Sequence, residues 1–365
     1  MSIAQAFPVG EHLEEELEAH GWSQAEFAEI IQRPTQFVSE VISGKKELTR
    51  ESAAQIAAAF GTSTEYWLNL QNRYLLWQQS QDKGLQSQLT DVQRRARLND
   101  LAPVSLLRKR GIIAEGSLAQ TEAQIIQLFG LGTIDDEPEF KAVARRSNEH
   151  EETTKLQRAW LAVIKNKARS QQLPVFDPAG FNTFARRISQ IVATPAAFAS
   201  LPQQFREHGV ALLYEESFPG SKLDGVSFLQ DGNPVIALSG RGKRLDKVLF
   251  TLLHEVAHIL NGDLKEGEIR VDTGINETAG VQGLDDQERA ADELAAELTF
   301  PNHEFSDPPS RVRSAWIQAE ADKHHVHPVV VIGRLQKMGN LDWRTVLAKG
   351  APTVEPQLAS WKYPF

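Results

Sequence analysis

The chain has 365 residues, of which 41% are hydrophobic and 24% charged, and it contains no cysteine. This length predicts two or three domains, and the lack of cysteine excludes a disulfide framework, a cysteine-ligated zinc site and a cysteine nucleophile. The formal net charge of −9 argues against a protein that binds polyanions over its whole surface. Because no membrane span or signal peptide is visible, we expect a cytoplasmic multidomain protein with no membrane partner.

The first 79 residues are predicted to form a compact all-α domain of five short helices. Amphipathic spacing, capping boxes, an N-cap threonine and terminal glycines mark where these helices begin and end. The residues that carry these signals are Val9, Leu13 and Leu17, Ser23 with Glu26, Pro34, Gly44, Thr49, Gly61, and Thr62 with Glu65.

The helix that begins near Pro34 is expected to be the second helix of a helix-turn-helix motif, which enters the major groove of DNA. Its exposed polar positions predict base contacts, because glutamine pairs with adenine, and serine and threonine reach base edges or phosphates. The candidates for base contacts are Thr35, Gln36 and Ser39, and those for phosphate contacts are Gln24, Lys45 and Lys46.

The charge of this domain argues against DNA binding over its whole surface, since residues 1–79 carry 5 Lys and Arg against 11 Asp and Glu. The acids gather at 11–18 on the predicted first helix, whereas Arg33, Lys45 and Lys46 border the predicted recognition helix. We therefore expect DNA binding through that helix. A helix-turn-helix domain used for protein contacts alone is the alternative.

Three segments of this domain resemble the HigA-type antitoxins of the xenobiotic-response-element regulator family, over about residues 5–79. The segments are Gly21-Trp22-Ser23-Gln24, Ser43-Gly44-Lys45-Lys46 and Thr64-Glu65-Tyr66-Trp67-Leu68-Asn69-Leu70-Gln71. The resemblance implies a homodimer that binds operator DNA, and a toxin partner that the domain neutralises.

Residues 80–170 are predicted to form a helical connector that carries the basic excess of the chain, with 15 Lys and Arg against 12 Asp and Glu. Basic runs occur at Arg94-Arg95-Ala96-Arg97 and Arg108-Lys109-Arg110. The simplest interpretation of these runs is a solvated charged face.

Residues 171–365 are predicted to form an α+β domain with a small sheet. Short β-prone runs, a hairpin turn at Asp231-Gly232-Asn233 and longer helical patterns support this fold class. Strands are expected at 210–214, 226–229 and 234–238, and helices at about 245–260, 287–298 and 329–338.

The first of these helices contains His254-Glu255-Val256-Ala257-His258. Histidines at i and i+4 lie on one helix face, so both imidazoles can bind one metal ion. Zinc would polarise a carbonyl and activate a water, and Glu255 would be the general base. The helix is apolar around the motif, and ionisable groups are rarely buried unless they are paired or bind a metal. Two hydrogen-bonded core histidines are the alternative.

A catalytic zinc needs a third protein ligand. Glu288 and Asp292, again at i and i+4, follow the motif by about thirty residues. We expect Glu288 to be that ligand and Asp292 to hold a ligand imidazole in the correct tautomer. The two roles can be exchanged, Glu293 or Glu297 can replace Glu288, and a solvated acidic helix face is the interpretation without a metal.

The reaction also needs a hydrogen-bond donor for the developing oxyanion. Among the candidates, His327 is preferred because it stands directly before the proline that opens the last predicted helix. The candidates are His303, His324, His325, His327 and Tyr214.

Residues 252–263, with Glu288-Arg289-Ala290-Ala291-Asp292 and Leu298-Thr299-Phe300-Pro301, resemble the ImmA/IrrE family of bacterial metallopeptidases, over about residues 175–340. The resemblance implies a gluzincin-like site with zinc as the cofactor. It also implies a protein substrate, because members of the family include peptidases that cleave repressors of mobile elements or stress genes. Leu294 stands where many members have phenylalanine, which leaves the predicted ligands unchanged.

Together these features predict a bacterial transcriptional regulator. A homodimer would bind operator DNA through residues 1–79, and residues 171–365 would be a zinc metallo-endopeptidase acting on a repressor or a toxin-system protein. One alternative is a non-catalytic repressor or antitoxin whose metal domain is a sensor or structural module, and another is a peptidase whose first domain only docks its substrate. Other divalent ions compete with zinc for such ligands.

Overall fold

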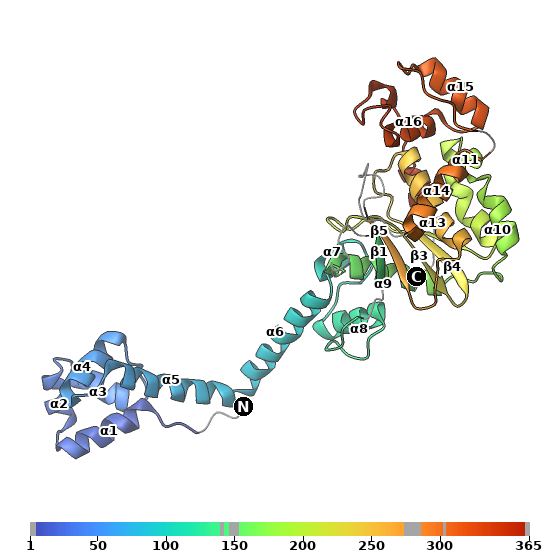
Figure 1. The fold of residues 1–365 in the computed structure, drawn as a ribbon. Coiled ribbons are helices and arrows are strands. Elements are labelled where there is room, and N and C mark those ends of the chain that lie inside the picture. The colour runs from blue at the N-terminus through green and yellow to red at the C-terminus, as the bar shows by residue number, and fades with distance from the viewer. Residues whose placement is uncertain (1–4, 139–141, 146–152, 274–285, 302–303, 362–365) are drawn as a thin grey trace. The chain divides into compact units, whose positions relative to one another are not determined.

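The computed structural model describes residues 5–138, 142–145, 153–273, 286–301 and 304–361 (Figure 1). The chain divides into two compact units, residues 1–96 and 97–365. Residues 97–170, which we assigned to a connector from the sequence, therefore lie within the second unit. The division of the chain into three functional parts stays a prediction.

The first unit is all α, as the sequence predicts. Its core packs large apolar side chains from every helix, among them Phe27, Val38, Ile56 and Trp67, all of which are fully buried. The helices are α1 (Val9–His20), α2 (Gln24–Ile30), α3 (Thr35–Ile42), α4 (Arg50–Phe60) and α5 (Thr64–Gln81), followed by α6 (Lys83–Leu101), which contains the boundary between the units.

The start of α5 differs from the prediction. The N-cap is Ser63, whose hydroxyl accepts a hydrogen bond from the Tyr66 amide at 3.1 Å, and it is not Thr62. Thr62 Oγ1 instead accepts the indole N–H of Trp67 at 2.8 Å. A buried indole N–H needs a hydrogen-bond acceptor, and Thr62 provides it, so its hydroxyl does not cap the helix.

The second unit contains the remaining helices and all the strands. No helix in the described part of the chain is both long enough and apolar enough to cross a bilayer. The helices are α7 (Val104–Lys109), α8 (Leu118–Phe129), α9 (Lys155–Arg169), α10 (Pro178–Ala185), α11 (Ile188–Ile191), α12 (Leu201–Glu207), α13 (Leu245–Asn261), α14 (Asp286–Thr299), α15 (Ser314–His324), α16 (Pro328–Lys337) and α17 (Glu355–Ala359), with 3₁₀ turns at Pro195–Ser200 and Val346–Ala348. The strands are β1 (Ala142–Arg145), β2 (Ala211–Tyr214), β3 (Leu223–Gln230), β4 (Asn233–Leu238) and β5 (Ile269–Thr273).

The strands form one mixed sheet in the order β1-β5-β3-β4-β2. β3 pairs antiparallel with β4 and β5, whereas β2 pairs parallel with β4, and β1 parallel with β5. The predicted hairpin between β3 and β4 is confirmed: Asp231 and Gly232 have φ of 53° and 82°, the left-handed conformation that a two-residue hairpin turn requires. The sequence predicted neither β1 nor β5.

Helices cover both faces of this sheet (Figure 1). Side chains alternate between the faces along each strand, so Leu212 packs in the core that contains α13, and Leu213 packs in the core that contains α9. On β3, Val226 points to the α9 side, and Gly225 lies against α13. This layering brings the apolar helix with the predicted metal motif directly onto the sheet.

A glycine sets the approach of α1 to α3 in the first unit. A Cβ at Gly10 would lie 2.5 Å from the carbonyl oxygen of Val41 and still closer to that of Ile42. We expect Gly10→Ala to destabilise this unit by about 1–3 kcal/mol, because backbone oxygens cannot move aside as a side chain can.

Differential scanning calorimetry of the full chain checks this prediction, with Gly84→Ala as the matched control. At Gly84 the nearest atom to the new Cβ is a flexible carboxylate oxygen of Asp82, at 3.2 Å. This variant should melt at or slightly above the wild-type temperature, since alanine favours a helix. If Gly10→Ala melts as the wild type does, the close approach of α1 and α3 is not a constraint.

Candidate metal centre and nucleic-acid interface

Helix α13 carries the predicted metal motif. It is apolar along nearly all its length because it packs between the sheet and α14. It ends at Gly262, whose φ of 73° closes the helix in the left-handed conformation that glycine favours. His254, Glu255 and His258 are all completely buried in this environment. Their burial requires partners inside the protein.

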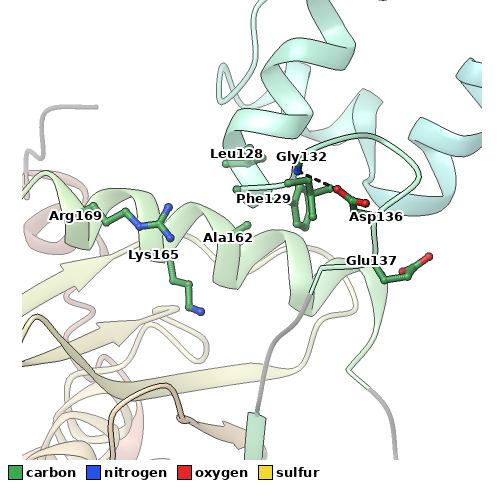
Figure 2. Close-up of a pocket in the computed structure, with 10 residues that line it drawn as sticks. Leu128, Phe129, Gly132, Asp136, Glu137, Ala162, Lys165 and Arg169 are labelled. Carbon is green, nitrogen blue, oxygen red and sulfur yellow. Dashed lines mark hydrogen bonds between the residues drawn. The ribbon is translucent and has the colours of Figure 1, made fainter.

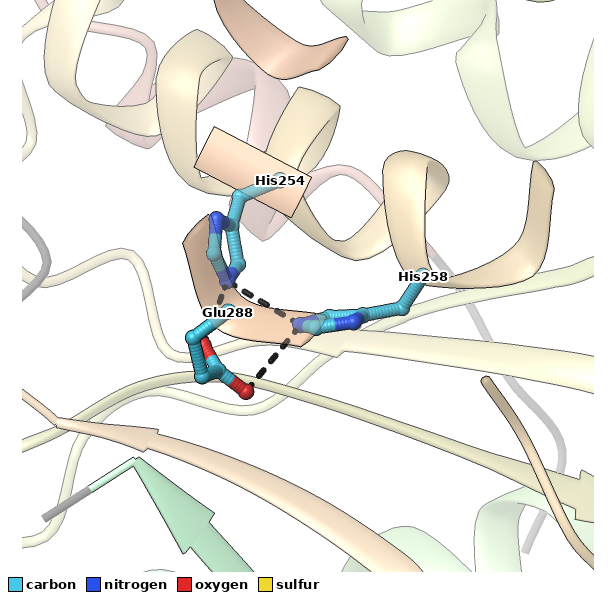
Figure 3. Close-up of side chains that lie close together, drawn as sticks. All are labelled: His254, His258 and Glu288. Carbon is cyan, nitrogen blue, oxygen red and sulfur yellow. Dashed lines mark hydrogen bonds and ion pairs between the residues drawn. The ribbon is translucent and has the colours of Figure 1, made fainter. Parts of the chain in front are cut away.

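The three predicted ligand residues meet at one point (Figure 3). The Nε2 atoms of His254 and His258 are 3.1 Å apart. Glu288, from α14, places Oε2 3.3 Å from Nε2 of His254 and Oε1 3.5 Å from Nε2 of His258. One possible ligand atom from each residue lies within 4.8 Å of the others. The i and i+4 spacing on α13 and the packing of α14 against it produce this convergence.

A carboxylate lies behind each imidazole. Asp292 Oδ1 is 2.9 Å from Nδ1 of His254, and Asp263 Oδ2 is 2.8 Å from Nδ1 of His258. A carboxylate at Nδ1 favours the tautomer with the proton on that nitrogen. Nε2 of each ring then carries a lone pair directed at the other two groups, and the 3.1 Å contact is not a hydrogen bond in this state.

The chemistry of these donors fits a cation. Two lone pairs and a carboxylate that converge in a buried space repel one another unless a positive charge lies among them. Burial by itself raises the pKa of Glu288, but when both rings are protonated, hydrogen bonds and positive charge from His254 and His258 outweigh burial and hold that pKa well below its usual range. Positive charge, on the two rings or as a bound cation, therefore stabilises the Glu288 carboxylate, and two His and one Glu are a typical zinc ligand set.

Arg270 on β5 connects the parts of this cluster that come from different elements. Its Nη1 donates to Glu288 Oε1 at 3.2 Å, its Nε donates to the carbonyl oxygen of Asp263 at 3.4 Å, and its Nη2 donates to Gln287. The guanidinium is buried, so these contacts also satisfy its charge. Arg270 thus fixes the start of α14 relative to the turn after α13, and it holds Glu288 in place.

Gly225 makes room for the carboxylate of Glu255. A Cβ at this position of β3 would be 3.2 Å from Cδ of Glu255, closer still to its Oε1, and 3.0 Å from Cγ2 of Thr251. The pairing of β3 with β5 shifts register between Leu223 and Gly225. The strand therefore passes so close to α13 that only glycine leaves Glu255 its present position.

The other acids considered as ligands lie elsewhere on α14. Glu293 and Glu297 are exposed, whereas Glu288 is buried. The packed side of α14 carries Ala291 and Ala295, both fully buried. Because Glu288 shares the buried side and the other two acids do not, the structure brings Glu288 to the histidines.

The described candidates for an oxyanion donor make contacts with residues other than His254, His258 and Glu288. His327 is the N-cap of α16, where its Nδ1 accepts the Val329 amide at 3.1 Å, and burial lowers its pKa. His324 Nε2 lies 3.0 Å from Glu320, His325 is the left-handed cap of α15, and His303 lies outside the described residues. Tyr214 packs edge-on against Trp361, and burial, together with nearby glutamates, raises its pKa to about 12.

The predicted DNA-contacting residues form an exposed polar surface in the first unit. Thr35, Gln36 and Ser39 are exposed on α3, Lys45 and Lys46 are exposed after it, and Gln24 is partly exposed at the start of α2. The apolar side of α3, with Phe37, Val38 and Val41, is buried in the core. The first turn of α3 is thus free to meet a groove or another surface.

Glu40 is an acid on this surface that the sequence analysis did not consider. Its carboxylate accepts Gln36 Nε2 at 2.8 Å and Lys46 Nζ at 3.2 Å. The hydrogen bond from Gln36 and then the ammonium of Lys46 lower the pKa of Glu40. A base that pairs with Gln36 would compete with this carboxylate for the amide.

Sequence reasoning also missed Asp263, Arg270 and Gly225. Asp263 stands just after the helix-ending Gly262, and that spacing could have suggested a partner for His258. The roles of Arg270 and Gly225 depend on the pairing of β3 with β5, for which the sequence offered no signal.

Comparison with known proteins agrees with both parts of this description. Residues 205–316, which include the three predicted ligand residues, match the family model of the IrrE N-terminal-like domain, and residues 13–67 match that of a helix-turn-helix. An uncharacterized HTH-type transcriptional regulator of Haemophilus influenzae is 35% identical over 23% of this chain and 79% of its own length. The corresponding values for the uncharacterized regulator YddM of Escherichia coli are 33%, 21% and 81%.

Among solved structures, the chain matches an addiction module antidote protein of the HigA family from Coxiella burnetii. That match has 32% identity, covers 22% of this chain and 88% of the other, and has a TM-score of 0.21. The predicted helix-turn-helix and IrrE-like domains are confirmed. The chain therefore belongs to the HTH-type transcriptional regulators, and its second unit carries an IrrE N-terminal-like domain, which is of metallopeptidase type.

Proposed function

We propose that the second unit of this regulator is a zinc-dependent endopeptidase that acts on a repressor or a toxin-system protein. We also propose that the first unit binds operator DNA as a homodimer in the cytoplasm. The observation that carries the peptidase proposal is the buried convergence of His254, His258 and Glu288, with a further buried acid, Glu255, on the helix of the two histidines.

In this proposal His254, His258 and Glu288 hold the metal, and Asp263 and Asp292 keep the two imidazoles in the binding tautomer. Bound zinc would act as a Lewis acid that polarises the scissile carbonyl and makes water more acidic. Glu255 would accept the proton of the attacking water and pass it to the leaving amine. Gly225 lets the Glu255 carboxylate take its place beside the cluster.

In the first unit, the exposed first turn of α3 supports DNA reading by Thr35, Gln36 and Ser39. Lys45, Lys46 and Gln24 would contact phosphates on either side. Arg33 and Lys46 both lie over the ring of Phe37 on α3, and the acids of α1 are on a different helix. Because the domain as a whole is acidic, it would attract DNA only weakly. A dimer doubles the number of contacts with DNA and would therefore bind the operator more tightly.

Exposed apolar side chains support the homodimer. Leu76 on α5, and Leu89 and Val92 on α6, are 53%, 42% and 56% exposed. Single exposed leucines are common, but these lie on consecutive helices of one unit. A second copy of the chain that covers these side chains would remove them from water.

The metal ligands can be tested by elemental analysis. Protein supplied with zinc should hold about one zinc per chain, and His254→Ala and Glu288→Ala should lose it, since a catalytic site has three protein ligands. Glu293→Ala and Glu297→Ala are matched controls on the same helix and should keep the metal because both side chains are exposed. Zinc lost in Glu293→Ala but kept in Glu288→Ala would reassign the third ligand.

The general base can be tested with Glu255→Gln, which keeps the shape of the side chain. We expect this variant to bind zinc normally and to lose cleavage by about 10²–10⁴-fold, the usual contribution of a general base. New protein termini, identified by mass spectrometry in cells, should occur with the wild type and with the control Glu293→Gln, but not with Glu255→Gln. No new termini with the wild type, together with an unchanged regulatory phenotype in Glu255→Gln, would leave a non-catalytic regulator.

The DNA surface can be tested by selecting binding sites from random duplexes and measuring affinities for them. Gln36→Ala and Ser39→Ala should reduce discrimination between bases, by about 1–3 kcal/mol for a bidentate contact. Lys45→Ala and Lys46→Ala should weaken binding to all sequences and lower the salt dependence. Gln79→Ala, exposed on α5, is the control. If Gln36→Ala and Ser39→Ala bind the selected site as the wild type does, α3 is not the recognition helix.

A further inference from the structure

Two arginines of the basic runs predicted from the sequence have internal partners. Arg97 donates to the carbonyl oxygens of residues 134–136, and Arg110 donates to those of residues 216 and 217. The interpretation of the basic runs as a solvated face is therefore incomplete, because these arginines tie loops together. Both belong to the part of the chain that shares a core with α8 and α9, the helices on either side of the cavity in Figure 2. On the other face of the sheet, a lysine of α16 contacts the metal cluster.

Lys337, the last residue of α16, donates from Nζ to Oδ2 of Asp292 at 3.5 Å. The other oxygen of that carboxylate, Oδ1, is 2.9 Å from Nδ1 of His254. Lys337, Asp292 and His254 thus form a continuous chain of polar contacts. That chain ends at Nε2 of the histidine, the atom that faces the other two predicted ligands.

The ring of Phe250 holds the ammonium group of Lys337 at this place. Nζ lies 3.9 Å from the centroid of the ring, well within the range of a cation–π contact. Phe250 is on α13, one turn before His254. The side chains of Lys337 and Asp292 are only 34% and 18% exposed, so solvent screens their attraction less than that of a fully exposed ion pair.

Helix α16 is itself fixed against the start of α13. Gln336 accepts Nη2 of Arg244 at 2.8 Å, and Arg244 also donates from Nε and Nη2 to the carboxylate of Asp246, at 2.6 Å each. A Cβ at Gly333 would lie 2.5 Å from Oδ2 of Asp246, so this glycine lets the two helices approach closely. The position of Lys337 is therefore built into the fold.

The other histidine has no such cation in the described part of the chain. Asp263 is 2.8 Å from Nδ1 of His258, and among the described residues no lysine or arginine lies within ion-pairing distance of its carboxylate. Arg270 donates only to the carbonyl oxygen of this aspartate. The side chain of Asp263 is 8% exposed, against 18% for Asp292. The carboxylate that is more open to water is thus the one that a lysine holds.

We propose that Lys337 is a positioning residue of the metal centre. By binding Oδ2 of Asp292, it directs Oδ1 at Nδ1–H of His254, which keeps the lone pair of Nε2 directed at the metal. This inference rests on the proposed metal site and extends it, because α16 lies outside residues 205–316, which match the IrrE-like family model. The metal centre would then depend on a side chain from beyond the matched domain.

Zinc affinity of the full chain, measured by competition with a fluorescent chelator, tests this role. Lys337→Met keeps an unbranched stem over Phe250 and removes the charge. We expect this variant to bind zinc about tenfold more weakly, the lower end of the effect of losing an outer partner of a metal-binding histidine. Lys337→Arg keeps the charge and should bind zinc nearly as the wild type does.

Lys247→Met is the matched control. Lys247 is also half-buried, and its Nζ lies 5.6 Å from the centroid of the Trp343 ring, but it forms no ion pair with a described carboxylate. Its replacement should leave zinc affinity unchanged. Circular dichroism checks that all three variants fold.

Nitrogen NMR of the histidine rings in the metal-free protein gives a second readout, which a merely structural role of Lys337 would not move. At a pH where both rings are neutral, Lys337→Met should lower the share of His254 that carries its proton on Nδ1. His258 should keep its tautomer, because its partner Asp263 has no contact with Lys337.

The two readouts separate this inference from the proposed function. A wild-type chain that binds no zinc would contradict the metal site, and the ring tautomers would then decide the role of Lys337 alone. If the wild type binds zinc, equal affinity in Lys337→Met would overturn the inference and leave the metal site standing. An equal loss of zinc affinity in Lys337→Arg and Lys337→Met would also overturn it, as would a tautomer of His254 that does not change in Lys337→Met.

Discussion

The second unit is organised around three electron-pair donors that converge where water cannot reach them. Two imidazole Nε2 atoms and one carboxylate repel one another in a low-dielectric interior, so a positive charge placed among them would stabilise the fold there. Protonation of the two rings is one source of that charge, and it holds the pKa of Glu288 below its usual range although burial raises it. The neighbouring polar groups favour a bound cation, since Asp263 and Asp292 turn the ring lone pairs inward.

These supporting groups come from separate parts of the fold, and that makes the cluster depend on the whole unit. The histidines are placed by one helix, but Glu288 reaches them only because small residues let α14 pack closely on α13. Arg270 then links the first turn of α14 to the end of α13 through strand β5. Gly225 on β3 contributes by lacking a side chain, because the Glu255 carboxylate fills the space that a Cβ would occupy.

The sheet separates two different chemical environments. On the α13 side, buried acids lie beside the two imidazoles, and Arg270 lies beside Glu288. On the α9 side, Lys165 and Arg169 line a cavity together with Phe129 and residues 130–132. In the first unit, the apolar side of α3 is buried and its polar side chains are exposed. Glu40 accepts hydrogen bonds from two residues of this exposed surface, Gln36 and Lys46.

The sequence by itself determined the features that depend on near neighbours in the chain. Helix ends follow from local hydrogen bonds, as at Ser23 and Gly262, and the hairpin at Asp231 follows from the backbone conformation of two residues. The histidine pair belongs to this class, because one helical turn is enough to align it. At Thr62 the local pattern predicted the N-cap one residue too early, because the Thr62 hydroxyl accepts the buried indole N–H of Trp67 and Ser63 caps the helix.

Only the tertiary structure decided which distant groups meet. It selected Glu288 over Glu293 and Glu297, because burial of a helix side depends on what packs against it. It placed Arg270 and Gly225 at the cluster through the pairing of β3 with β5, and it put residues 97–170 into the second unit. Contacts of this kind join residues far apart in sequence, and no local pattern records them.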